Sequence, residues 1–178
     1  MIYYARVFVN MIHDKAKQIE LLILDVDGVL TNGKIYLSPS GEEMLAFHIH
    51  DGHGLKLLQE IPVEIAVISG RNNKAAQLRL MNLGITHIYL GEKDKALRYI
   101  LLQQTLHIKP ENTAYMGDDL PDLPVMTQVG LPIAVKNAVD EVKKIALWET
   151  TKPGGKGAVR EVCDIIYAAK KCETRGVK

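Results

Sequence analysis

The chain has 178 residues, of which 47% are hydrophobic, so its length and composition suit a globular domain with a sizeable core and exclude a disordered chain. Its formal net charge of +1 does not favour nucleic acid or an acidic membrane as a partner. With only two cysteines there is no disulfide framework, which favours the cytoplasm, and the apolar residues 1–12 are too short to cross a bilayer.

The first core strand is expected at residues 21–24, where four aliphatic residues in a row are typical of a strand buried on both faces. Asp25 and Asp27 follow it directly, and Gly28 and Gly33 then interrupt regular structure. Two neighbouring carboxylates raise each other's pKa unless a cation is present. The loop therefore predicts a site for a hard divalent cation at the carboxyl end of a parallel strand.

Strand and helix patterns alternate along the rest of the chain. Short strands at 34–37 and 44–49 flank a turn sequence and predict a β-hairpin flap over 34–49, and Asp51 is expected to cap the helix that follows. Further strands are expected at 65–68, 87–90, 113–116 and 131–135, and helices at 51–59, 73–82, 94–107, 122–129, 138–145 and 158–169.

Continuous apolar strands that alternate with helices are typical of a parallel sheet. We therefore predict a single α/β domain over residues 1–178, with a doubly wound parallel sheet and helices on both faces. Residues 1–15 are expected to form an N-terminal extension, and residues 170–178 a C-terminal tail.

Polar side chains follow several of these strands. Ser69 and Gly70 follow the second core strand, Asp118 and Asp119 follow the fourth, and Lys95 begins the helix after the third. Ligands bind at the carboxyl ends of the strands in such sheets, so we expect these loops to converge on one mouth.

The groups expected at this mouth suit phosphoryl transfer. Carboxylates can hold Mg²⁺, and a serine, a backbone N–H and a lysine can bind phosphate. One aspartate can attack phosphorus while a second carboxyl group moves the proton. The spacing leaves open which of Asp25 and Asp27 attacks.

Four stretches resemble the motifs of the haloacid dehalogenase superfamily of phosphatases: residues 25–31 (DVDGVLT), 68–71 (ISGR), Lys95 and 117–122 (GDDLPD). The resemblance covers residues 20–169 and is strongest to the cap-less phosphatases of 3-deoxy-D-manno-octulosonate 8-phosphate. Stretches 47–52 (FHIHDG), 83–87 (LGITH) and 154–161 (GGKGAVRE) are also similar to these enzymes. His50 departs from the pattern, because relatives usually carry Arg there.

The resemblance implies a role for each matching residue. Asp25 would be the nucleophile and a metal ligand, and Asp27 would be the general acid/base and bind metal through its backbone carbonyl. Asp118 would be the third protein ligand of Mg²⁺, for which Mn²⁺ or Co²⁺ could substitute. The remaining residues would bind phosphate or support the metal site: Ser69, Gly70 and Lys95 for phosphate, and Asp119 and Asp122 for metal-bound water or the loop.

Two arginines are candidates for the carboxylate of a sugar acid, because Arg can pair with a carboxylate through two hydrogen bonds. They are Arg71 and Arg79. The resemblance favours a role for Arg79 at the site of a neighbouring subunit, although it could equally be an exposed helix charge. Asp122 could likewise be a plain N-cap before Leu123.

The implied function is Mg²⁺-dependent hydrolysis of this eight-carbon phosphate in lipopolysaccharide core sugar biosynthesis. One alternative is a phosphatase of nine-carbon ulosonate 9-phosphates, from sialic acid or KDN. Another is a non-catalytic oligomerisation module, like the domain fused to acylneuraminate cytidylyltransferases. Because the motif spacing leaves room only for a hairpin and no cap domain, hairpins of several subunits would have to cover the mouth, and the resemblance implies a homotetramer.

Overall fold

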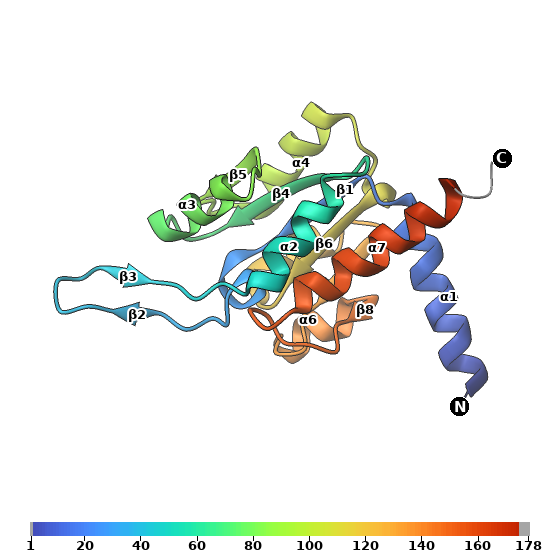
Figure 1. Cartoon of the computed structure of the whole chain (residues 1–178), viewed down its shortest axis with the longest axis horizontal. Helices are drawn as coiled ribbons and strands as arrows, with labels where there is room; N and C mark the ends of the chain where they lie inside the picture. Colours follow the sequence, from blue (N-terminus) through green and yellow to red (C-terminus); the bar gives the residue numbers. More distant parts are fainter. Residues whose placement is uncertain (1, 175–178) are drawn as a thin grey trace.

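The computed structural model describes residues 2–174, and the side chains of residues 9–171. A six-stranded sheet, with every neighbouring pair parallel, has the strand order β5-β4-β1-β6-β7-β8 (Figure 1). The strands of this sheet are β1 (Leu21–Leu24), β4 (Glu64–Ser69), β5 (His87–Leu90), β6 (Thr113–Gly117), β7 (Leu131–Ala134) and β8 (Trp148–Glu149).

Helices cover both faces of the sheet, as expected. In Figure 1, α2 and α7 pack together in front of the sheet, and α1 packs against α7. Arg79 of α3 lies against Gly52 of α2, on the same face. The helices α4, α5 and α6 contact one another on the opposite face, as right-handed crossovers require. The helix bounds are α1 (Ile2–Gln18), α2 (Ile49–Leu58), α3 (Lys74–Asn82), α4 (Lys95–Leu106), α5 (Leu123–Met126), α6 (Asp140–Ile145) and α7 (Ala158–Thr174), with short turns η1 (Val26–Leu30), η2 (Pro110–Asn112) and η3 (Leu120–Asp122).

The central strand β1 explains where the first carboxylate lies. All four of its residues are fully buried, and it pairs with β4 on one side and with β6 on the other. Burying a leucine side chain contributes about 1.5–3 kcal/mol, so this strand is firmly anchored. Asp25 is the next residue, and its backbone N–H still donates to the carbonyl of Met116 in β6, 3.1 Å away.

The hairpin is present but shorter than predicted. Its strands β2 (Tyr36–Leu37) and β3 (Glu43–Met44) are antiparallel and project from the carboxyl end of the sheet (Figure 1). At its base Thr31 and Phe47 form an isolated bridge. The predicted strand over 44–49 was wrong beyond Met44, because α2 already begins at Ile49.

Asp51 was wrongly expected to cap the helix that follows the hairpin. The N-cap of α2 is His48, whose ring accepts a hydrogen bond from the backbone N–H of His50. Asp51 is buried inside α2 and accepts from the backbone N–H groups of Gly157 and Arg160, at 3.2 and 2.8 Å. Its carboxylate therefore satisfies the start of α7, a pairing of distant residues that local pattern could not indicate.

Other differences lie near the chain ends. Residues 1–15, expected as an extension, belong largely to α1, whose Ile12 and Ala16 join the core. The strand β8 was not predicted, and the helix expected over 122–129 ends at Met126. The tail expected from 170 continues α7 to Thr174, and residues 175–178 lie outside the described residues.

The described segments between the sheet strands contain no cap domain. The connection from β1 to β4 holds the hairpin and α2, and the connection from β4 to β5 holds α3. Within the described part of the chain, no helix is long and apolar enough to span a membrane.

Candidate active site

A pocket of about 320 Å³ opens at the carboxyl ends of the central strands. Loops after β1, β4 and β6 and the first turn of α4 form it, so the convergence expected from the motif order is present. Its lining contains nearly all the candidate residues: Asp25, Asp27, Ser69, Gly70, Arg71, Lys95, Asp118, Asp119 and Asp122, with Gly33 and Pro121. Arg79 is the exception, because it lies on α3 beside α2 and does not line the pocket.

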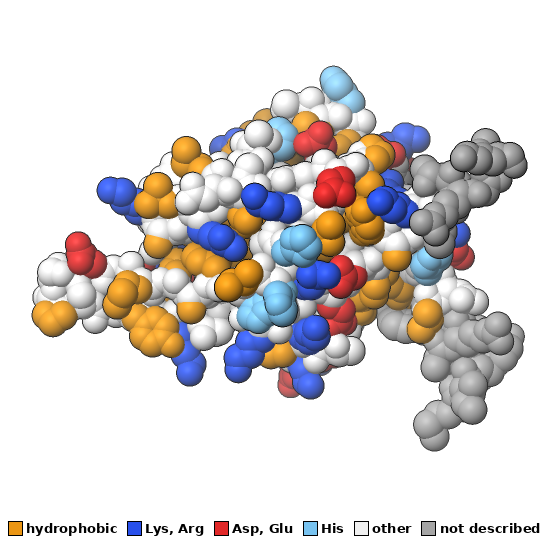
Figure 2. Space-filling model, in the orientation of Figure 1, with side chains coloured by type: hydrophobic (Ala, Val, Ile, Leu, Met, Phe, Trp, Pro, Cys, Tyr) orange, Lys and Arg blue, Asp and Glu red, His pale blue; other side chains and the backbone are white. Residues whose placement is uncertain are grey.

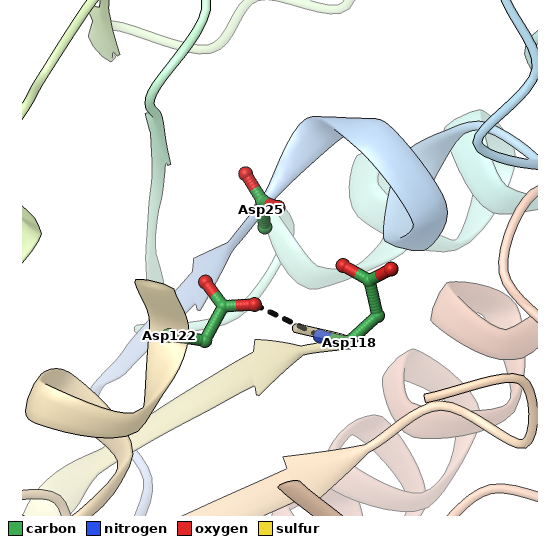
Figure 3. A group of neighbouring side chains, drawn as sticks. All are labelled: Asp25, Asp118 and Asp122. Carbon is green, nitrogen blue, oxygen red and sulfur yellow. Dashed lines mark hydrogen bonds between the residues drawn. The ribbon is translucent and has the colours of Figure 1, made fainter. Parts of the chain in front are cut away.

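Three carboxylates converge at the pocket floor (Figure 3). Each of Asp25, Asp118 and Asp122 offers an oxygen within 4.8 Å of the other two. Among the described residues, Oδ1 of Asp118 is buried and accepts no hydrogen bond, and Oδ1 of Asp25 is buried and lies 3.0 Å from Nζ of Lys95. Buried, unpartnered carboxylate oxygens are costly unless a cation binds them, so this donor set fits a hard metal ion.

Asp122 holds the loop after β6 together, and its carboxylate oxygens are already hydrogen-bonded and not free to bind a metal ion. Its Oδ1 accepts from Lys95 Nζ at 2.8 Å and from the Tyr115 hydroxyl at 2.7 Å. Its Oδ2 accepts from the backbone N–H groups of Asp118 and Asp119, at 2.9 and 3.2 Å. With both oxygens occupied, Asp122 orients Asp118 and the lysine. Its side chain makes no N-cap hydrogen bond to α5, and its supporting role stays a prediction.

Tyr115 was not identified from the sequence. It lies in β6 and is fully buried beneath the pocket, where its hydroxyl donates to Asp122. A tyrosine in a buried strand, two residues before Gly117, was the available signal, because a buried hydroxyl needs a partner.

Lys95 provides the buried positive charge of the site. It is 6% exposed, and its Nζ lies 3.0 Å from Oδ1 of Asp25 as well as 2.8 Å from Asp122. Burial alone would lower the pKa of Lys95, but the two carboxylates outweigh burial and raise it above its ordinary value. Lys95 is therefore a permanent cation that can pair with an anionic ligand.

Asp25 and Asp118 are hard to ionise without a further cation. Burial, and then the negative charge of Asp122, raises the pKa of Asp25 from 3.8 to about 7, although Lys95 opposes the shift. Burial, followed by the charges of Asp25 and Asp122, raises the pKa of Asp118 to about 7 as well. A bound divalent cation would reverse this balance and favour both carboxylates.

The turn η1 carries Asp27 to the pocket wall. Gly28 has φ +87°, and a side chain there would overlap the carboxylate of Asp118, so only glycine suits this position. The carboxylate of Asp27 accepts a hydrogen bond from Arg71 Nη1 at 3.2 Å. The predicted contribution of Asp27 to a metal through its backbone carbonyl stays a prediction.

Ser69 ends β4 and is 2% exposed. Its Oγ accepts weakly from the backbone N–H of Arg71, 3.4 Å away, so its own hydroxyl proton can point into the pocket. Ser69 and Lys95 thus flank the acid cluster as the phosphate-binding hypothesis requires.

Known proteins resemble this chain along most of its length. Residues 84–162 match the family model of haloacid dehalogenase-like hydrolases. The 3-deoxy-D-manno-octulosonate 8-phosphate phosphatase of Escherichia coli K12 is 47% identical over 156 residues, which cover 88% of this chain and 83% of the relative. The chain therefore belongs to the haloacid dehalogenase-like hydrolases and, within them, to the same family as this phosphatase.

Solved structures agree with the family assignment. A haloacid dehalogenase superfamily hydrolase from Legionella pneumophila has a TM-score of 0.93 and 45% identity, over 95% of this chain and 93% of its own. The 3-deoxy-D-manno-octulosonate 8-phosphate phosphatase of Moraxella catarrhalis, solved with magnesium, phosphate and KDO, has a TM-score of 0.88 and 38% identity, over 95% and 99% of the two chains.

Proposed function

We propose that this protein is a Mg²⁺-dependent phosphatase of 3-deoxy-D-manno-octulosonate 8-phosphate, acting in the cytoplasm in lipopolysaccharide core sugar biosynthesis. One observation carries the proposal: the buried Asp25, which is paired with the buried Lys95, shares a pocket with a buried and unpartnered oxygen of Asp118 in a chain of this phosphatase family. Such a pocket can hold a cation and a phosphate together. Asp25, Asp118 and the backbone carbonyl of Asp27 would hold Mg²⁺, with Mn²⁺ or Co²⁺ as substitutes, and the ion would neutralise charge on the phosphate.

The side chains then divide the chemistry. Asp25 attacks phosphorus and becomes an aspartyl phosphate, and Lys95 and Ser69 hold the phosphate oxygens. Asp27, which lies at the pocket wall, gives a proton to the leaving sugar oxygen. It then takes a proton from the water that attacks the aspartyl phosphate, which restores Asp25 and releases phosphate.

Arg71 is the best-placed group for the carboxylate of a sugar acid. It lines the catalytic pocket, and its guanidinium carries five N–H donors, of which two are paired with Asp27 and Glu43. Arg79 does not line this pocket, so its proposed role remains at the site of a neighbouring subunit. His50 is exposed at the start of α2, where it could change substrate affinity relative to an arginine.

The assembly proposed is a homotetramer. The hairpin exposes several large apolar side chains, and Figure 2 shows hydrophobic side chains along it. They are Ile35, Tyr36, Leu37 and Met44. An exposed apolar hairpin with open strand edges favours packing against other copies, and such packing would cover the mouth.

Two alternative functions can be distinguished from the one proposed. A phosphatase of nine-carbon 9-phosphates would use the same pocket, whereas a non-catalytic oligomerisation module would not need Asp25, Asp118 and Lys95 to converge. That convergence favours an enzyme.

Steady-state rates on the eight-carbon ester, a nine-carbon ester and p-nitrophenyl phosphate, with Mg²⁺ and with EDTA, test the proposal. We expect Mg²⁺-dependent hydrolysis with the highest kcat/KM on the eight-carbon ester. A preference for the nine-carbon ester would overturn the substrate, and no hydrolysis of any ester would favour the module.

A further inference from the structure

Glu43 connects the hairpin to the catalytic pocket. It lies in β3, and its Oε2 accepts from Arg71 Nη2 at 2.6 Å and from Asn73 Nδ2 at 2.5 Å. Within the described side chains of the hairpin, Glu43 alone has hydrogen bonds that reach the body of the sheet domain. The contact is therefore the polar tie between the flap and the loop after β4.

The position of Glu43 is well determined because its partner Asn73 is fixed. Asn73 is 7% exposed and is the N-cap of α3, where its Oδ1 accepts from the backbone N–H of Ala76 at 3.1 Å. The same amide group donates to Glu43 through its nitrogen. The N-terminus of a helix also favours a nearby negative charge, so Glu43 is held by hydrogen bonds and by the helix dipole.

Arg71 lies between two cavities and is fixed from both sides. Its Nη1 donates to Asp27 in the catalytic pocket, and its Nη2 donates to Glu43. Besides the catalytic pocket, Arg71 lines an outer cavity of about 710 Å³ between the hairpin and α3, which Glu43 and Lys74 also line. A ligand with its phosphate in the inner pocket can extend past Arg71 into this cavity.

We propose that Glu43 is a positioning residue that determines specificity for acidic substrates. It holds the guanidinium of Arg71 at the boundary of the two cavities, ready to pair with a carboxylate on the substrate. A guanidinium held in place loses less conformational freedom on binding than a mobile one. The inference rests on the proposed function, and it adds a residue of the hairpin to the recognition of the sugar acid.

The test compares Glu43→Ala with two other variants on two substrates. Glu141→Ala is the control, because Glu141 is an exposed carboxylate on α6 whose side chain forms no hydrogen bond in the described structure and lines neither cavity. Glu43→Gln keeps an acceptor oxygen for Arg71 and Asn73. The substrates are the eight-carbon sugar-acid ester and p-nitrophenyl phosphate, which has no carboxylate.

For Glu43→Ala we expect the ratio of kcat/KM on the sugar-acid ester to kcat/KM on p-nitrophenyl phosphate to fall about tenfold, mainly through a higher KM for the ester. Glu43→Gln should recover most of that ratio, and Glu141→Ala should keep it. Equal losses on both substrates would show a merely structural role, and an unchanged ratio would show that Arg71 needs no support; either result overturns the inference.

Wild-type rates separate this inference from the proposed function. A wild type that prefers the sugar-acid ester supports the function whatever Glu43→Ala does. A wild type that hydrolyses p-nitrophenyl phosphate without preferring an acidic ester would overturn both the substrate and the role of Glu43.

Discussion

Asp25 shows how a single buried residue can be prepared for chemistry. It directly follows a fully buried strand, and Lys95 lies 3.0 Å from its Oδ1. The carboxylate is therefore held in place by the strand and by one cation, and it lines the pocket in which a metal ion and a phosphate would bind.

Asp25→Asn should abolish turnover with little change in fold. The amide keeps the shape of the side chain but is a poor nucleophile and a poor metal ligand, so we expect kcat to fall by at least about a thousandfold. Phosphatase rates and circular dichroism measure the two effects. Asp119→Asn, at an exposed position, is the control and should lose much less activity. Unchanged turnover in Asp25→Asn would refute the covalent mechanism.

The pKa values near 7 predict that Mg²⁺ binding depends on pH. Because the pKa values of Asp25 and Asp118 are raised from 3.8 to about 7, the metal-free folded state binds protons more tightly than the unfolded state does. Its free energy of unfolding should therefore fall as pH rises from about 4 to about 7. Mg²⁺ needs the ionised carboxylates, so it should raise Tm more at pH 8 than at pH 6.

Thermal unfolding with Mg²⁺ and with EDTA at both pH values measures this effect. Asp118→Asn should lose most of the Mg²⁺-dependent shift at either pH. An equal or smaller shift at pH 8 in the wild type would contradict the site assignment.

At the scale of elements, the turn η1 is held from behind by the loop that precedes α7. The backbone N–H of Gly155 donates to the carbonyl of Val29 at 2.9 Å, and a side chain at Gly154 would overlap the carbonyl of Gly28. The amide of Asn137 bridges Gly28 and Gly154. The backbone of this loop thus packs directly on the backbone of η1. This contact fixes the position of the turn that carries Asp27.

Gly154→Ala should displace η1. We expect a loss of about 1–3 kcal/mol in the free energy of unfolding, as for other overpacked sites, and a fall in kcat of at least about tenfold. Denaturant unfolding and phosphatase rates measure both. Lys152→Ala, which removes an exposed side chain from the same loop, is the control. A variant that loses stability but keeps full kcat would show that the loop does not position the site.

For the whole molecule, the hairpin carries apolar side chains that the described chain leaves exposed to water. Leu37 is 68% exposed and Met44 is 61% exposed, although both are large apolar residues. The rest of the described chain covers neither side chain. Contact with further copies would remove this apolar surface from water and would also enclose the mouth.

Charges on the hairpin should therefore break the assembly. We expect Leu37→Lys combined with Met44→Lys to sediment as a smaller species and to lose activity on the sugar-acid ester, because the mouth would be open to water. Leu97→Lys is the control, since Leu97 is 54% exposed on α4, away from the hairpin. Wild-type protein that sediments as a fully active monomer would contradict the assembly.

The local sequence pattern was sufficient to predict strands and helix starts, because these depend on residues that are close together in the chain. The buried run before Asp25 predicted β1, and Asn73 and Asp94 start α3 and α4 as the patterns indicated. Because parallel strands end at one edge of a sheet, motif order also predicted that Asp25, Lys95 and Asp118 would meet.

Pairings between distant segments could not be predicted in this way. Asp51 was expected to cap its own helix, but its carboxylate accepts hydrogen bonds from backbone N–H groups at the start of α7, more than a hundred residues away. The two-residue strand β8 has too little pattern to detect, and it forms because β7 offers an open edge.

The sequence by itself determined the parallel sheet, the set of acids at its edge and the family, since apolar runs, turn residues and motif order are all local or ordered along the chain. Only the tertiary structure decided which aspartate can still bind a metal ion and which one already has both oxygens hydrogen-bonded. Asp118 keeps a buried oxygen without a hydrogen bond and Asp25 faces the ammonium group of Lys95, whereas Asp122 is saturated by Lys95, Tyr115 and two backbone N–H groups. The physical reason is that hydrogen bonds and burial depend on packing across strands, which sequence spacing does not encode.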